Sequence, residues 1–150
     1  MTYDLPLPDL SDPGTGPFWA AARDERLEVQ RCARCEAPRW PPRPVCPQCL
    51  SPGGTWTPVA PTGTVWSHAT YRRAMAPGFA AIVPYTVALV ELDAGVRMIG
   101  RVLSPPEDVV IGSRVEAAFE AVTDDVTLVH WRPLPTDSRP TAVPLANSAL

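Results

Sequence analysis

Two Cys-x-x-Cys pairs constrain this chain more than any other feature, and they contain all of its cysteines: Cys32, Cys35, Cys46 and Cys49. A two-residue gap lets both thiolates of a pair turn towards one cation, so the two turns together can supply a tetrahedral site of four sulfurs. Two disulfides are the alternative, which we disfavour because nothing in the sequence marks the chain as exported. We therefore predict one metal ion bound by all four cysteines.

Zinc fits this site better than iron. The second half of the cysteine-rich segment lacks the glycines expected of an electron-transfer site, and nothing else in the sequence suggests a redox partner. Four sulfur ligands leave no open coordination position on zinc, so the ion should be structural. Binding it would order a segment that is too short and too proline-rich to bury a core of its own.

The overall composition argues against nucleic-acid and membrane partners. The net charge is -3, whereas a nucleic-acid-binding domain normally carries a basic face. No apolar run approaches the length of a membrane span, and the first residues lack the basic start and apolar core of a secretion signal. We therefore expect a cytoplasmic protein. Every basic residue is an arginine, so the chain cannot form a lysine Schiff base.

Downstream of the cysteines the pattern is that of short β-strands. In residues 113–122, Val115, Ala117 and Phe119 alternate with a second set that includes Ala118, which predicts one buried and one exposed face. Strands are expected at residues 64–73, 85–92, 96–103, 113–122 and 126–135. Five short strands with a long first connection and no helix favour a small Greek-key barrel of the OB type, with a small β-sandwich as the alternative.

The chain is thus mainly β and divides into four parts. Residues 1–26 form an N-terminal extension and a short helix, 27–60 the metal-binding segment, 61–134 the barrel and 135–150 an irregular tail. The helix, expected within residues 15–27, carries Phe18 and Trp19, whose bulk demands a partner surface. Two partner surfaces for Phe18 and Trp19 stay open: the cysteine-rich segment of the same chain, or another protein chain.

Several motifs together resemble one protein family. They are Phe18-Trp19, the cysteine pairs around Pro41-Pro42-Arg43, and three motifs in the barrel region: Gly63-Thr64-Val65, Pro84-Tyr85 and Glu91-Leu92-Asp93-x-Gly95. In this order, from about Pro17 to Pro133, the chain resembles the DUF35 proteins, in which a rubredoxin-like zinc ribbon precedes an OB-fold barrel. Trp131 stands where the family usually has phenylalanine.

The resemblance implies a hetero-oligomeric accessory subunit without catalytic residues of its own. Such proteins act beside thiolase-fold enzymes on acyl-CoA, in archaeal thiolase and HMG-CoA synthase assemblies, in acyltransferases that make acylated phenols, and in aldolases that shorten steroid side chains. The OB domain is expected to help form the acyl-CoA site. Arg72 and Arg73 suit the CoA phosphates, and the apolar loop that follows, with Phe79 and Tyr85, suits an acyl chain or pantetheine arm.

Two other functions stay open on the residues alone. An enzyme acting alone on acyl-CoA would need a nucleophile and a base, but His68 and His130 each sit singly within a predicted strand. A single-stranded nucleic-acid binder would suit an OB barrel with a zinc ribbon, and Trp66 and Tyr71 would stack on bases or fill the barrel core. The acidic balance argues against that function.

Three segments carry more large apolar groups than a chain this short can bury. They are the helix with Phe18 and Trp19, residues 40–44, and the loop at residues 74–84. Exposed apolar groups of this kind mark contact surfaces. We therefore expect these segments to contribute to a protein interface.

Overall fold

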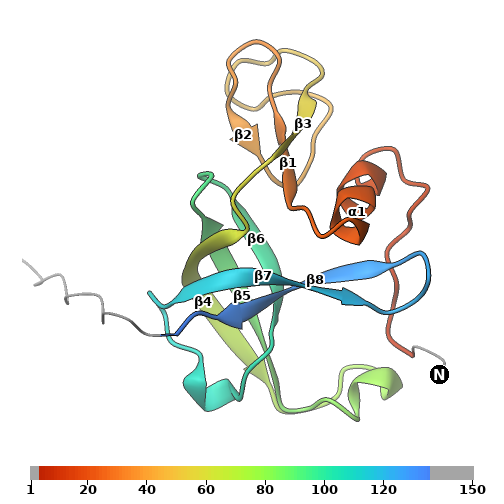
Figure 1. Cartoon of the computed structure of the whole chain (residues 1–150), viewed down its shortest axis with the longest axis vertical. Helices are drawn as coiled ribbons and strands as arrows, with labels where there is room; N and C mark the ends of the chain where they lie inside the picture. The colour runs from red at the N-terminus through yellow and green to blue at the C-terminus, as the bar shows by residue number, and fades with distance from the viewer. Residues whose placement is uncertain (1–3, 136–150) are drawn as a thin grey trace, which may run out of the picture.

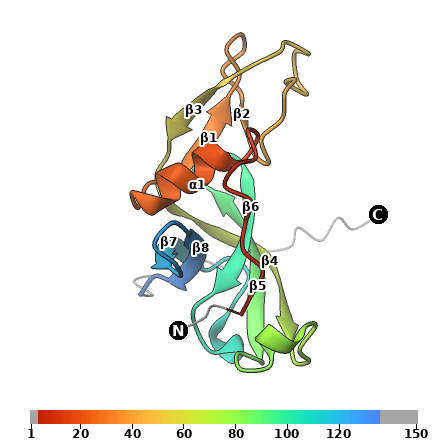
Figure 2. The ribbon, with the colours of Figure 1, turned by 90° about the vertical axis from the view of Figure 1, so that its right-hand side faces the viewer.

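The computed structural model describes residues 4–135, and most of the predicted tail, from residue 136 onward, lies outside them. These residues form a small three-stranded sheet, one α-helix and a closed barrel of five strands. Figures 1 and 2 show the small sheet at one end of the molecule, the barrel at the other, and α1 beside the junction. Among the residues described, no helix combines the length and apolar character needed to cross a membrane.

The small sheet has the strand order β2-β1-β3, with all pairs antiparallel. Its strands are β1 (Glu28–Arg31), β2 (Pro38–Arg39) and β3 (Thr55–Pro58). The first cysteine pair lies between β1 and β2, and the second lies between β2 and β3. Strand β1 leads directly into Cys32, and β2 has only two residues, too few to leave a pattern in the sequence.

The barrel closes in the order β4-β5-β6-β8-β7, with β7 pairing back onto β4. Only β6 and β8 run parallel. This is the predicted five-stranded OB-type barrel rather than a sandwich. Its strands are β4 (Thr62–Tyr71), β5 (Tyr85–Leu92), β6 (Arg97–Val102), β7 (Arg114–Ala121) and β8 (Thr127–Pro133).

The strand ends and the connections differ slightly from the expected ones. The first barrel strand is displaced by two residues, because Thr62 already pairs with Glu116 across the β4–β7 seam. Two single turns of 3-10 helix, where no helix was predicted, lie in the connections after β4 and β6: η1 (Pro77–Phe79) and η2 (Pro106–Asp108). Both turns begin with a proline, which fixes a backbone angle suited to a helical start.

Trp131 of β8 is the largest fully buried side chain and packs in the barrel interior. An added Cβ at Gly100 of β6 would come within 2.7 Å of the indole Nε1, so only glycine leaves room for this ring. Trp131 thus fills the core beside Gly100.

The assignment of Ala118 to an exposed face of β7 is wrong. Ala118 is only 5% exposed. It pairs with His130 of β8, and α1 packs against both β7 and β8. The N-terminal part of the chain therefore covers some of the outer face of this hairpin, and an alternating pattern within one strand cannot show that cover.

The helix α1 (Gly16–Arg23) joins the two parts of the molecule. It begins after Thr15, whose backbone N–H and hydroxyl both donate to the carboxylate of Asp12. Phe18 is 2% exposed and its ring lies 4.3 Å from that of Trp40, centroid to centroid. Local packing against the cysteine-rich segment is therefore confirmed for Phe18, and its assignment to an interface with another chain is wrong.

Candidate metal centre and ligand cavity

The four cysteines converge on one point. The sulfurs of Cys32 and Cys49 lie 3.5 Å apart, those of Cys35 and Cys46 lie 3.7 Å apart, and all four are within 4.8 Å of one another. A tetrahedral ion with metal–sulfur bonds of about 2.3 Å requires sulfur–sulfur separations of roughly 3.8 Å. The predicted ligand set is therefore assembled, with free thiols, in a geometry that fits one tetrahedral metal ion.

Backbone and hydroxyl donors in the second turn favour thiolates. Hydrogen bonds from the side chain and the backbone N–H of Ser51 lower the pKa of Cys49 to about 6. The N–H groups of Cys49 and Gln48 likewise lower the pKa of Cys46. The turn thus holds two sulfurs ready in the form that binds a metal.

The pKa of Cys35 shifts in the opposite direction. The N–H of Ala37 donates to its sulfur and opposes the change, but burial and the three neighbouring sulfurs raise the pKa of Cys35 to about 11. A bound dication would stabilise all four thiolates together. The donor set therefore fits a dication better than it fits four free thiols.

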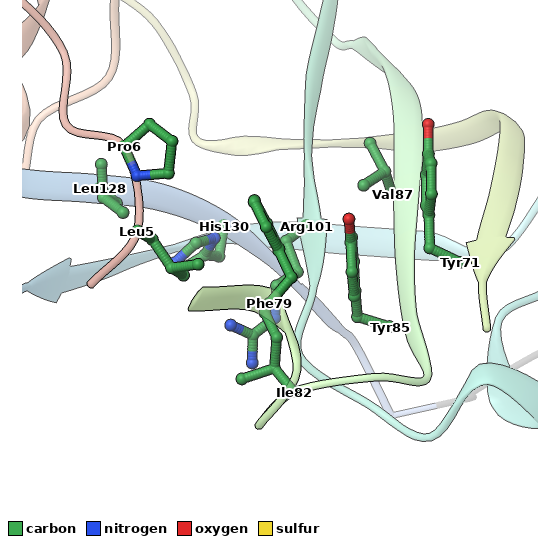
Figure 3. A pocket seen from close by; sticks show the side chains of 10 residues that line it. All are labelled: Leu5, Pro6, Tyr71, Phe79, Ile82, Tyr85, Val87, Arg101, Leu128 and His130. Atoms are coloured by element: carbon green, nitrogen blue, oxygen red, sulfur yellow. The ribbon is translucent and has the colours of Figure 1, made fainter. Parts of the chain in front are cut away.

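A second feature is a cavity of about 340 Å³ on the outer face of the barrel. Figure 3 shows its walls, which come from the N-terminal segment, the β4–β5 connection and strands β4, β5, β6 and β8. The lining is mostly apolar and aromatic: Leu5, Pro6, Tyr71, Phe79, Ile82, Tyr85, Val87, Arg101, Leu128 and His130. Apolar cavities with a few polar groups are typical of small-molecule sites.

Three aromatic rings stack along one wall of this cavity. Tyr71 and Tyr85 lie 5.1 Å apart with an interplanar angle of 8°, and Phe79 lies 5.4 Å from Tyr85 with an angle of 23°. The structure thus brings Phe79 and Tyr85 together in the cavity lining, and their contact with an acyl-CoA stays a prediction. Arg72 and Arg73 are exposed in the loop after β4 and do not line the cavity.

Arg101 and His130 line the cavity but were not expected to belong to a site. The Nε2 atom of His130 lies 2.8 Å from a carboxylate oxygen of Glu120. Burial lowers the pKa of His130, although Glu120 opposes this shift. Arg97 of β6 and Arg132 of β8 share the outward register of these two residues, so the sequence pattern alone does not single out Arg101 and His130.

The N-terminal arm, residues 4–8, forms the remaining wall. Leu5 and Pro6 line the cavity, and Asp4 lies against Gly78 of η1. A Cβ at Gly78 would clash with the carbonyl oxygen of Asp4 and would lie 3.2 Å from a methyl group of Leu5. Glycine at this position therefore lets the arm lie across the β4–β5 connection.

The remaining predicted contact residues are only partly covered. Trp40 is half-buried against Phe18, whereas Met75 in the β4–β5 connection is 72% exposed. Trp66 does not fill the barrel core: it is 49% exposed, and the guanidinium of Arg97 lies 3.9 Å from its ring centroid. Among the described residues, the β4–β5 connection thus keeps one large apolar side chain, that of Met75, at the surface.

Comparison with known families matches both parts of the chain. Residues 19–53 match the family model described as the rubredoxin-like zinc ribbon domain of ChsH2, and residues 56–120 match the C-terminal OB-fold domain of ChsH2. A DUF35 domain-containing scaffold protein of Methanocaldococcus jannaschii is 33% identical over 98 residues, which cover 63% of this chain and 68% of that protein. The chain belongs to the DUF35 family.

Two further relatives of this DUF35 chain have more specific descriptions. A probable enoyl-CoA hydratase alpha subunit of Thermomonospora curvata is 37% identical over 118 residues, which cover 77% of this chain but only 36% of that protein. The chain thus spans little more than a third of that relative. The solved structure described as the Ltp2-ChsH2(DUF35) aldolase superposes with a TM-score of 0.76 at 33% identity, over 84% of this chain and 98% of that one.

Proposed function

We propose that this DUF35 chain is a non-catalytic accessory subunit that binds a thiolase-fold enzyme and helps to form its acyl-CoA site. The observation that carries the proposal is the likeness to the Ltp2-ChsH2(DUF35) aldolase structure, which extends over 98% of the compared chain. A thiolase, an acyltransferase and a side-chain-cleaving aldolase are the partner classes that the sequence resemblance implies. The relative described as a scaffold protein supports the same kind of role.

Exposed apolar residues supply a surface for such a partner. A contiguous patch of large exposed apolar side chains on a small protein is typical of a protein-contact surface. The exposed large apolar side chains of the barrel part lie in the β4–β5 connection, on the outer face of β4 and β6, and in the β6–β7 connection: Met75, Trp66, Tyr71, Ile99, Val110 and Ile111. We propose that the β4–β5 connection contacts the partner, with residues 40–44 contributing from the ribbon.

The cavity and the two arginines beside it support a role in acyl-CoA binding. Arg72 directly follows Tyr71, which lines the cavity, and both Arg72 and Arg73 are exposed. The exposed arginines would bind an anionic phosphate outside the cavity, and the apolar lining would bind an apolar group within it. We propose that Arg72 or Arg73 binds a CoA phosphate while Phe79 and Tyr85 contact the acyl or pantetheine part.

We propose zinc as the ion bound by the four cysteines. Zinc is consistent with a tetrahedral set of four thiolates and with the family description of the ribbon. With all four positions taken by protein, such an ion links the two turns and does not act on substrate. Metal-binding free thiols also suit the cytoplasmic location that the sequence leads us to expect.

Reconstitution from purified components tests the proposal. The zinc-loaded chain is mixed with the thiolase-fold enzyme encoded beside it or recovered with it, and complex formation is measured by analytical ultracentrifugation. We expect a stable hetero-oligomer whose acyl-CoA turnover needs both chains, while this chain alone turns over no acyl-CoA. Steady turnover by the isolated chain would instead support the alternative of an independent enzyme.

A hydratase is a second class of partner. The observation that favours it is the relative described as an enoyl-CoA hydratase alpha subunit, which shares this region but is far longer. Reconstitution distinguishes the two classes, because a hydratase partner would add water to an enoyl-CoA without breaking a carbon–carbon bond. Shift of a labelled single-stranded oligonucleotide at low salt would support the third alternative, nucleic-acid binding.

The division into residues 1–26, 27–60, 61–134 and 135–150 stays our working proposal for the domains. The ribbon match, 19–53, ends before the proposed boundary between residues 60 and 61, and the barrel match, 56–120, begins before it and crosses it. Limited proteolysis of the zinc-loaded chain tests it, because accessible linkers are cut before folded domains. Early cleavage near residues 59–61 is the expected result.

A further inference from the structure

The N-terminal arm, residues 4–8, lies against the cavity without belonging to the barrel. Among the described residues that line the cavity, only Leu5 and Pro6 come from outside the barrel strands and their connections. Figure 3 shows these two residues at one end of the cavity and Tyr71 at the other. Leu5 is partly buried, whereas Leu7 is 43% exposed. The arm therefore contacts the cavity mainly through the side chain of Leu5.

Apolar packing and a close backbone approach hold the arm in place. Among residues 4–135, neither a hydrogen bond nor an ion pair joins residues 4–8 to the rest of the chain. The carbonyl of Asp4 lies directly against Gly78 of η1, and a methyl group of Leu5 lies beside the same glycine. Because no strand pairing is broken when these contacts are lost, the arm can leave while the barrel stays folded.

The residues that follow the arm are anchored by hydrogen bonds. The carboxylate of Asp9 accepts from the backbone N–H and the hydroxyl of Ser11, at 2.9 and 2.6 Å. The carboxylate of Asp12 accepts in the same way from Thr15, at 3.2 and 2.7 Å, just before α1. Residues 4–8 therefore form a short segment that is tethered beside the cavity even when it is not docked there.

The sequence of the arm matches the lining of the cavity. Leu5 and Leu7 each precede a proline, which favours an extended backbone. Grooves lined by aromatic rings are recurring sites for extended proline-containing segments. The stacked rings of Tyr71, Tyr85 and Phe79 give this cavity such a lining. The cavity thus has the wall expected of a site for an extended leucine–proline segment.

The charges of the arm and of the cavity are complementary. Residues 4–10, DLPLPDL, contain two aspartates and no basic residue. Arg101 lines the cavity, and Arg72 and Arg73 are exposed in the loop after β4. Within the described chain, the acidic side chain bonded to a lining residue is that of Glu120, and these three arginines outnumber it. An acidic segment is therefore favoured here over a basic one.

We propose that the cavity is a docking groove for an extended leucine–proline segment with an acidic residue before the leucine, and that residues 4–8 occupy one end of this groove within the chain itself. A partner protein that presents such a segment docks by displacing the arm. The inference goes beyond the proposed function, because it requires neither acyl-CoA nor a thiolase-fold enzyme. An acyl group held by Phe79 and Tyr85 would use the same lining, so it and the segment would exclude each other.

The tether decides how strongly the arm competes with a partner segment. A segment joined by a few residues has an effective concentration of roughly millimolar, which a separate segment must exceed. The parent chain should therefore bind a free segment weakly. Removing the leucine side chain from the arm leaves the groove itself intact, so it should strengthen binding from outside.

A peptide with the sequence of residues 4–10, acetyl-DLPLPDL-amide, tests the inference on the zinc-loaded full-length chain. Titration followed by two-dimensional NMR of the backbone amides gives both the affinity and the place of binding. We expect the Leu5→Ser variant to bind the peptide about tenfold more tightly than the parent, with shifts at Phe79, Tyr85 and Val87. Leu10→Ser is the matched control and should behave as the parent, because Leu10 is 39% exposed and does not line the cavity.

Two further measurements separate the groove from the arm. A peptide in which serine replaces the first leucine should lose its binding to the Leu5→Ser variant. Gly78→Ala obstructs the place where the segment lies, so this variant should bind the original peptide no better than the parent does, although its own arm is released. Release of the arm alone is therefore not sufficient for binding from outside.

Three results would overturn the inference: equal affinity of the parent and the Leu5→Ser variant for the peptide, equal binding of the serine-containing peptide, or no shifts at cavity residues at peptide concentrations of roughly 10 mM, well above the effective concentration of the arm. Assembly with an acyl-CoA enzyme is measured separately by ultracentrifugation. A chain that binds the peptide as described but never assembles with such an enzyme would refute the proposed function and leave the groove assignment standing.

Discussion

The guanidinium of Arg114 donates hydrogen bonds to both carboxylate oxygens of Asp93, at 2.7 and 2.6 Å. Asp93 follows β5, Arg114 begins β7, and the hydroxyl of Thr62 at the start of β4 donates to the same carboxylate at 2.6 Å. Three strands thus meet at one carboxylate beside the β4–β7 seam that closes the barrel. A bidentate pair of this kind is better ordered than a single-contact surface ion pair.

Acid should weaken the barrel through Asp93. Hydrogen bonds from Arg114, then from Thr62, lower the pKa of Asp93 from 3.8 to about 2. A carboxyl whose pKa is lowered by folding stabilises the fold above its unfolded pKa and loses that contribution as the pH falls. The contribution should therefore be complete above about pH 4 and lost between pH 4 and pH 2, as urea unfolding at several pH values would show.

The Asp93→Asn variant isolates this effect. It should be less stable at pH 7 by up to about 1 kcal/mol, because the pair is half exposed, and its stability should change less between pH 4 and pH 2 than that of the parent. Glu91→Gln is the control, since Glu91 makes one contact of 2.9 Å with Arg97 on the surface. An unchanged acid profile in the Asp93→Asn variant would contradict the assignment.

Replacing Cys46 with serine should release the metal ion. The remaining three sulfurs cannot complete the tetrahedral set, and the turns of the ribbon have little core of their own. We expect loss of stoichiometric zinc in elemental analysis and loss of amide protection around residues 32–54, with the barrel strands still protected. His68→Ala, which alters an exposed residue of β4, should retain one zinc per chain; retention of zinc by Cys46→Ser would contradict the four-cysteine site.

Gly78→Ala should release the N-terminal arm. The added Cβ would clash with the carbonyl of Asp4, so residues 4–8 should exchange their amide hydrogens faster while the barrel keeps its stability. Gly14→Ala is a suitable control, because its Cβ would meet a carboxylate oxygen of Asp12 at 3.4 Å, an ordinary contact. Equal protection of the arm in both variants would show that Gly78 does not govern its position.

Met75→Ser should weaken assembly with the partner without changing the stability of this chain. The side chain is 72% exposed, so its removal costs the folded chain little, whereas removing an apolar anchor from an interface typically weakens binding about tenfold or more. Titration calorimetry with the purified partner measures the change. Leu50→Ser, an exposed apolar residue of the ribbon, is the control, and equal weakening by both variants would show that the β4–β5 connection is not a specific contact.

The metal centre and the barrel could be predicted from the sequence because their signals are local. Cysteine spacing alone specifies the ligand set, and the alternation of β-strand residues specifies most of the barrel. The surface that covers Phe18 could not be predicted, because the sequence does not show that Trp40 folds back to place its ring 4.3 Å from that of Phe18. From the sequence, Trp66 and Tyr71 suited base stacking and the barrel core equally well, but in the structure they are 49% and 38% exposed and do not fill the core.

The cavity was only partly foreseen because strands and segments far apart in the chain assemble it. Phe79 and Tyr85 were expected from one apolar loop, whereas Leu5 and His130 come from opposite ends of the described chain. His130 was interpreted as a structural hydrogen-bonding residue, which its contact with Glu120 supports for one nitrogen only. Only the parallel pairing of β6 with β8 shows that Arg101 stands beside it.

The central claim, that this DUF35 chain works as a subunit of an acyl-CoA enzyme, is tested most directly by one reconstitution. Acyl-CoA turnover is measured for the purified thiolase-fold partner alone, for this zinc-loaded chain alone, and for the equimolar mixture. We predict turnover only in the mixture, together with a hetero-oligomer of fixed composition. Full activity of the partner alone, or steady turnover by this chain alone, would contradict the account.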